Sequence, residues 1–207
     1  MPTHRVLILA ALIVLATAAG WYVTWRLSPT TNPPLTAVPG TSSTVGGPFT
    51  LVTHTGKTVT DADFRGKYLL VNFGYTYCPD VCPTTLQTIA LTLDALGNDA
   101  AAVQPLFITV DPQRDTAEVL AGYVAAFDPR IIGLTGTPQQ IIDTAKTFHA
   151  YYAKVEANDG TGDYFMDHSA FIYLMDPDGR SLTALPYQKT PQAIAEAIRS
   201  YMQSAKS

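Results

Sequence analysis

Short apolar segments alternate with longer segments of helical periodicity after residue 48, and this alternation limits the possible folds more than any other feature. Strand patterns occupy residues 68–73, 106–110, 131–134 and 169–175. Turn sequences at 55–57 and 176–179 predict hairpins that pair 49–54 with 58–59 and 169–175 with 181–184. Helix patterns occupy residues 81–96, 116–127, 138–148 and 191–202. We therefore expect an α/β fold in which helices flank one central sheet.

Twenty uncharged residues, 6–25, separate Arg5 from Arg26. A helix of that length spans roughly the 30 Å of a bilayer core. Two positive groups, Arg5 and the α-amino group, precede the segment and Arg26 follows it, which predicts a cytoplasmic N-terminus. We expect a single-pass anchor over residues 1–27.

The alternative to an anchor is a cleaved signal peptide, because Ala16-Thr17-Ala18 fits a small-residue cleavage site. The apolar run continues beyond that site, which favours the anchor. No cysteine lies near residue 20, and only five residues precede the run, so neither a lipoprotein anchor nor a mitochondrial transit peptide is expected. These features predict a bacterial inner-membrane protein with its C-terminal domain in the periplasm.

Residues 28–48 form a second distinctive segment, in which 16 of 21 residues are Pro, Gly, Ser or Thr and none is charged. Such a segment buries too little apolar surface to fold, so we expect a flexible linker and a folded domain over 49–207. Without Arg5 and Arg26, 11 basic residues stand against 17 acidic ones, a net charge of −6. This balance argues against nucleic acid and suits a cation or a basic partner.

The two cysteines, Cys78 and Cys82, follow the apolar strand 68–73 at the start of the predicted helix. Their spacing predicts that both lie on one face of the first helical turn, where N-terminal amides favour thiolates. Two thiolates suit Cu(I) or Zn²⁺. A structural disulfide is the alternative, but it would close a loop of only about five residues and contribute about 2 kcal/mol. We favour metal or redox chemistry.

A metal site needs a further ligand, and the sequence contains four histidines. His4 precedes the apolar run, His54 precedes a turn and is expected to be solvated, and His149 fits a helix end or a packing position. His168 stands directly before the strand pattern 169–175. From the residues alone, His168 is either a ligand or a structural residue at a strand edge.

Three separated motifs resemble those of the Sco (SenC/PrrC) family within the thioredoxin-like superfamily. They are Cys-Pro-Asp-Val-Cys-Pro at 78–83, Val-Asp-Pro-Gln-Arg-Asp-Thr at 110–116 and Asp-His-Ser at 167–169. The resemblance covers roughly residues 48–204. It implies a thioredoxin-like fold with an inserted hairpin, and binding of both Cu(I) and Cu(II).

The resemblance also implies the roles of particular residues. The copper ligands would be Cys78, Cys82 and His168. Asp167 would hold the charge or geometry of the site, and Asp111 is the other acidic candidate for that role, although a turn at a strand end also explains it. Asp115 and Met166 fit a helix cap and a packing position.

The function implied is delivery of copper to the dinuclear centre of cytochrome c oxidase, by a carrier rather than an enzyme. Two thiolates and a neutral imidazole would leave Cu(I) three-coordinate, so a client ligand could attack it. The expected partners are the copper-centre subunit of the oxidase and a second periplasmic copper carrier. Two alternatives remain, a membrane-anchored thiol-disulfide oxidoreductase that reduces client cysteines and a redox or copper sensor. His168 separates delivery from thiol exchange, because thiol exchange uses only the two cysteines.

Overall fold

The computed structural model describes Thr17 and residues 45–157 and 163–205. Apart from Thr17, the predicted anchor over 1–27 lies outside the described residues, and so does most of the predicted linker over 28–48. Within the described ranges, no helix is both long and apolar enough to cross a membrane. The described residues from Val45 onward belong to one compact unit, residues 42–207.

A seven-stranded mixed sheet forms the centre of this unit, with strand order β2-β1-β5-β4-β3-β8-β9. The three inner strands β5, β4 and β3 are parallel, and the outer pairs are antiparallel. The predicted central sheet is therefore confirmed. The strands are β1 (Thr50–Thr53), β2 (Thr58–Thr60), β3 (Tyr68–Gly74), β4 (Val103–Thr109), β5 (Ile132–Thr135), β8 (Phe171–Met175) and β9 (Ser181–Pro186).

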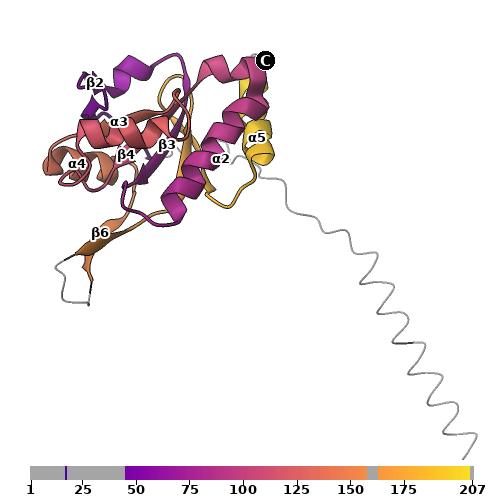
Figure 1. The fold of residues 1–207 in the computed structure, drawn as a ribbon. Helices are drawn as coiled ribbons and strands as arrows, with labels where there is room; N and C mark the ends of the chain where they lie inside the picture. The colour runs from indigo at the N-terminus through magenta and orange to yellow at the C-terminus, as the bar shows by residue number, and fades with distance from the viewer. Residues whose placement is uncertain (1–16, 18–44, 158–162, 206–207) are drawn as a thin grey trace, which may run out of the picture. The chain divides into compact units, whose positions relative to one another are not determined.

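The helices flank this sheet, as predicted. They are α2 (Val81–Leu96), α3 (Ala117–Ala125), α4 (Pro138–Thr147) and α5 (Pro191–Ser204), with short 3-10 turns η1 (Asp61–Phe64) and η2 (Gly97–Ala102). Helices α2 and α5 pack against each other, and Figure 1 shows the strands between this pair and the pair α3 and α4. Thr137 and Thr190 cap α4 and α5 with their side-chain oxygens, and a proline follows each cap.

Strand β3 lies in the core and ends at the functional site, and all of its residues are buried. Phe73, near its end, packs against Phe148 and Tyr173 with ring centroids 5.4 and 6.0 Å apart. Burial of one such aromatic side chain stabilises a fold by about 1.5–3 kcal/mol. The backbone that leads into the cysteine loop is therefore held by buried core side chains.

A separate two-stranded sheet stands apart from the central one. It consists of β6 (Tyr152–Glu156) and β7 (Tyr164–His168), which pair antiparallel with Tyr152 opposite His168. Figure 1 shows this hairpin extending away from the main sheet. It is the inserted hairpin that the family resemblance implies. The predicted strand over 169–175 was too long at its start, because the chain leaves β7 after His168 and enters β8 only at Phe171.

Candidate metal centre

The site begins where β3 ends, at Gly74. A Cβ atom on this residue would lie 2.6 Å from Cys82 Sγ and 2.8 Å from a ring carbon of Phe107. Real Cβ atoms do not approach so closely, and both Cys82 and Phe107 are buried side chains in a close-packed core. Glycine at this position therefore allows a cysteine sulfur to lie against the end of the strand.

The two cysteines occupy different structural positions. Cys82 is the second residue of α2 and is only 1% exposed. Cys78 lies in the loop before α2, where its backbone N–H donates to the Tyr75 carbonyl at 3.3 Å. The prediction that both cysteines share the first helical turn was wrong, because the helix begins only at Val81. The pair still meets, since the Cys82 N–H donates to Cys78 Sγ at 3.4 Å.

His168 reaches the cysteines from the end of β7. Its Nε2 lies 3.2 Å from Cys82 Sγ, and its Nδ1 lies 3.1 Å from the Ser169 carbonyl oxygen. A carbonyl only accepts, so this contact places a proton on Nδ1, and Nε2 is the ring nitrogen that faces the sulfurs. The ring also packs edge-on against Tyr75 at 5.8 Å, which fixes its plane.

The sulfurs of Cys78 and Cys82 and a ring nitrogen of His168 all lie within 4.8 Å of one another. Both cysteines are free thiols. Among the described residues, no other group of three histidine, cysteine or acidic side chains converges in this way. Two soft sulfur donors with one imidazole match the preferences of Cu(I) and Zn²⁺, and the donor set leaves room for a further ligand.

The thiols differ in acidity. Hydrogen bonds from the Cys82 thiol, the His168 ring and the backbone lower the pKa of Cys78 to about 3, although its partial burial opposes this. The hydrogen bond to Cys78, together with burial, raises the pKa of Cys82. Burial works to lower the pKa of His168, but the Cys78 sulfur, the Ser169 carbonyl and the charge of Asp167 raise it overall. A bound cation would displace the protons that these groups share.

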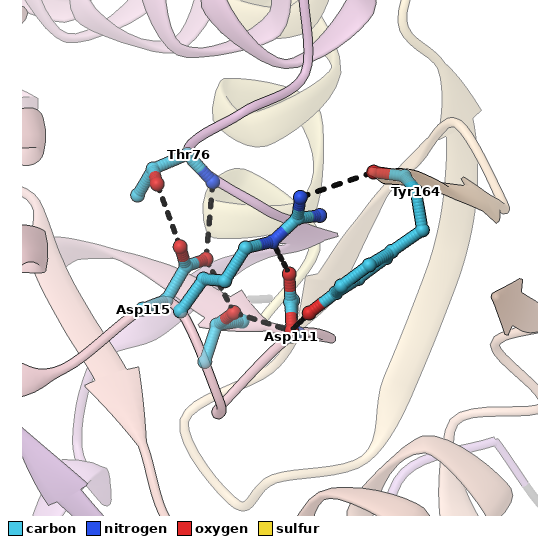
Figure 2. A network of polar contacts seen from close by, with 6 residues as sticks. Thr76, Asp111, Asp115 and Tyr164 are labelled. Atoms are coloured by element: carbon cyan, nitrogen blue, oxygen red, sulfur yellow. Dashed lines mark hydrogen bonds and ion pairs between the residues drawn. The ribbon is translucent and has the colours of Figure 1, made fainter. Parts of the chain in front are cut away.

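Asp115 supports the cysteine loop from below. Its carboxylate accepts from the backbone N–H of Thr76 at 3.0 Å and from the hydroxyls of Thr76 and Thr109, both at 2.6 Å (Figure 2). Burial raises the pKa of Asp115, while these hydrogen bonds act to lower it. The expected role as a helix cap was wrong, because Thr116 caps α3 by accepting from the Val119 N–H. The motif at 110–116 includes Asp115, but its spacing does not predict the contact with Thr76.

The other two acidic candidates lie around the site in different ways. Asp111 is 4% exposed and binds Arg114 and the Tyr164 hydroxyl, the latter at 2.9 Å, without a hydrogen bond to the cysteines or His168 (Figure 2). Asp167 is exposed on β7 opposite Ala153, and its charge helps to raise the pKa of His168. Sequence reasoning did not single out Arg114 and Tyr164, which lie beside the site.

The other described histidines, His54 and His149, do not belong to the three-ligand cluster. His54 was expected to be solvated, but it is only partly exposed and its Nδ1 accepts from the Gly133 N–H at 3.0 Å. His149 ends the turn after α4 with a φ of 51°. His4 lies outside the described residues. Met166 is buried in the core cluster, as expected for a packing residue.

This combination of a mixed central sheet, an inserted hairpin and a two-thiol, one-imidazole cluster defines a thioredoxin-like domain with a candidate metal centre. The family model described as SCO1/SenC matches residues 38–203. The chain belongs to the SCO1/SenC family.

Similar sequences agree with this assignment. The protein SenC of Rhodobacter capsulatus is 43% identical over 161 residues, which cover 78% of this chain and 72% of SenC. Protein sco1 of Schizosaccharomyces pombe is 42% identical over 164 residues, covering 78% of this chain and 62% of that protein. The chain thus spans less than two thirds of the length of the fission-yeast relative.

Solved structures with the same fold include proteins that hold copper. Bradyrhizobium japonicum ScoI with copper bound superposes with a TM-score of 0.70 at 46% identity and covers 76% of this chain and 99% of its own. Yeast Sco1 with copper bound has a TM-score of 0.72 at 37% identity, and the match covers 77% of this chain and 89% of that one. BsSco is a member of the Sco family of cytochrome c oxidase assembly proteins in which a disulfide switch has been identified. Its TM-score is 0.58 at 25% identity, and the match covers 77% of this chain and 91% of that one.

Proposed function

We propose that this chain binds copper through Cys78, Cys82 and His168. The observation that carries the proposal is the convergence of their ligand atoms to within 4.8 Å, with both thiols free. Copper in the solved ScoI and Sco1 structures supports it. Asp167 would adjust the charge around His168, and Asp111 would act at longer range through Arg114.

The proposed purpose of this binding is delivery of copper to the dinuclear copper centre of cytochrome c oxidase. Cys78 is half-buried and Tyr77 beside it is 63% exposed, so a client can approach the metal from this side. A site with three protein ligands accepts an incoming thiolate or imidazole more readily than a closed four-ligand site. The partners would be the oxidase subunit that holds the copper centre and a periplasmic carrier that supplies the metal.

The setting proposed for this function is the periplasmic face of a bacterial inner membrane. Residues 1–27 would anchor the chain, residues 28–48 would act as a linker, and residues 49–207 would form the copper-binding domain. The apolar run over 6–25 supports the anchor, and the Pro- and Thr-rich composition of 28–48 supports the linker. Mild extraction of membranes with high salt and then with detergent tests this arrangement, since only detergent should release an anchored chain.

Metal analysis tests copper binding directly. The reduced protein should bind one equivalent of Cu(I) or Cu(II), and Cu(II) should give intense thiolate-to-copper absorption in the visible. Oxidation to the Cys78–Cys82 disulfide should abolish both. His149→Asn is the matched control for His168→Ala, because His149 lies outside the ligand cluster. A colourless copper complex would remove the cysteines from the site and contradict the proposal.

Thiol-disulfide exchange is the second candidate, favoured by the low pKa of Cys78, about 3, beside a second thiol. Cells carrying His168→Ala separate the two functions. If the protein delivers copper, these cells should lose oxidase assembly at limiting copper, and added copper should restore it. Normal oxidase assembly in His168→Ala cells would contradict delivery and favour thiol reduction.

A further inference from the structure

The ligands of the candidate site come from two structural elements that must be held together. The cysteines follow β3 of the central sheet, whereas His168 ends β7 of the separate two-stranded sheet. The backbone ladder of β7 runs only to β6, so it does not fix the hairpin against the cysteine loop. Side chains that bridge the two elements therefore decide where the imidazole lies.

Arg114 makes such a bridge. Its Nη1 donates to the backbone carbonyl of Tyr164, the first residue of β7, at 3.0 Å, and its Nε binds Asp111. The guanidinium carbon lies 3.6 Å from the centroid of the Tyr164 ring, against which it stacks. The Tyr164 hydroxyl donates back to Asp111 at 2.9 Å, so the three residues form a closed unit (Figure 2).

The same guanidinium also faces the cysteine loop. Its carbon lies 4.7 Å from the centroid of the Tyr77 ring and 5.8 Å from that of Tyr75. Tyr77 is the neighbour of Cys78 in the chain, and Tyr75 packs edge-on against His168. Arg114 therefore contacts both elements that contribute ligands.

The geometry of β7 links the position of Tyr164 to that of His168. Side chains alternate along a strand, so Tyr164, Met166 and His168 project from one face of β7. Met166 between them is 9% exposed and belongs to the core cluster. Holding Tyr164 thus sets the tilt of the face that presents the imidazole, while the ladder with β6 sets its register.

We propose that Arg114 is a positioning residue for the metal centre, which docks β7 against the cysteine loop and so holds His168 Nε2 beside the two sulfurs. This inference rests on the proposed copper function where copper affinity is measured. Its structural test, the amide exchange of β7, does not depend on that function. A lysine cannot replace the contacts, because one ammonium group lacks the planar fork that reaches Asp111 and the Tyr164 carbonyl while stacking on the tyrosine rings.

The test compares Arg114→Gln and Arg114→Lys with Arg130→Gln. Arg130 is a matched control because it also pairs with carboxylates, Asp128 and Asp94, and contacts none of the three ligands. Copper(I) affinity is measured by competition with a chromophoric chelator. The intensity of the thiolate-to-copper(II) absorption, the amide exchange of residues 164–168 and the rate of Cys78–Cys82 disulfide formation are measured beside it.

Both Arg114 variants should bind Cu(I) about tenfold or more weakly, with altered charge-transfer absorption and faster exchange in β7. Disulfide formation should be unchanged, since both cysteines lie in one loop and helix start. Arg130→Gln should match the wild type. Wild-type affinity in Arg114→Gln would overturn the inference, and so would rescue by Arg114→Lys, which would mean that charge and not geometry matters.

A second variant covers the case in which Arg114→Gln does not fold. Tyr164→Leu removes the stacked ring and its hydroxyl from the hairpin side of the same unit, and it should produce the same weakening. Unchanged copper affinity in that variant would overturn the inference. If the wild-type protein bound no copper, the proposed function would fail, whereas unchanged exchange of β7 in the Arg114 variants would show separately that Arg114 does not dock the hairpin.

Discussion

The two halves of the candidate site differ in how the fold holds them. The cysteine half continues a fully buried strand, and Cys82 is 1% exposed. The histidine half lies on a hairpin whose outer face exposes Val155 and Phe165, 49% and 52%. Core packing fixes the first half, and a few bridging side chains fix the second. A ligand set of this kind combines a rigid thiol pair with an adjustable imidazole.

This difference has a consequence for function. Metal release requires one ligand to leave before the others, and the ligand on the less constrained element moves at the lower cost in packing. If the chain delivers copper as proposed, His168 is the ligand expected to yield to a client, while the thiol pair retains the metal until transfer. Changes in the cysteine half should then have larger effects than changes in the histidine half.

The largest expected effect belongs to Cys82→Ser. It replaces a buried sulfur with a hard hydroxyl that does not ionise at neutral pH, so copper affinity should fall by at least about a hundredfold, or about 2.7 kcal/mol. Competition with a chelator measures this loss. A Cys82→Ser protein with affinity within a few-fold of the wild type would contradict the assignment of Cys82 as a ligand.

Gly74→Ala should be the next most severe change. The added Cβ meets Cys82 Sγ and the Phe107 ring, so unfolding should become easier by about 1–3 kcal/mol. Gly122→Ala is the control, because a Cβ there meets nothing within 4 Å and alanine favours the helix. Urea titration compares the two. Equal stability of Gly74→Ala and Gly122→Ala would show that the strand end is not tightly packed.

His168→Ala should have a smaller effect on copper and should leave disulfide formation intact. We expect copper binding to weaken by about tenfold or more, at least about 1.4 kcal/mol, because the imidazole is lost while both sulfurs stay in place. Disulfide formation between Cys78 and Cys82 should persist. A variant that lost disulfide formation as well would show that the two halves are not independent.

The smallest effect concerns the pH dependence of Cys78. Since its pKa is about 3, the thiolate is present throughout pH 5–8, and alkylation of the metal-free protein should change little across that range. An ordinary thiol would react about a thousandfold more slowly at pH 5 than at pH 8. Mass spectrometry after timed iodoacetamide treatment measures both rates. A tenfold rise per pH unit would contradict the depressed pKa, and bound copper should protect the thiol.

Local patterns predicted the elements of the core well, and the hairpin poorly. The periodicity of residues 81–96 matches the observed α2, because its apolar face packs on the sheet. Apart from the buried Met166, strands β6 and β7 carry exposed and half-buried residues of mixed character, so they have no clear pattern. Their pairing depends on contacts with distant residues, such as that of Arg114 with Tyr164.

The candidate ligands show the same division. The cysteines are four residues apart, so the sequence alone indicates that they meet. Asp115, which is not a ligand, was wrongly expected to cap a helix, because both it and Thr116 are good helix caps and the exit direction of β4 decides which one turns inward.

By itself, the sequence determined the α/β class, the bounds of α2 and the cysteine pair that follows a buried strand. These features depend on periodicity, capping and spacing, which act over a few residues. Only the tertiary structure decided that His168 lies 3.2 Å from Cys82, 86 residues earlier in the chain. That contact depends on how a hairpin docks on a sheet, and docking is settled by packing and side-chain bridges that no local pattern encodes.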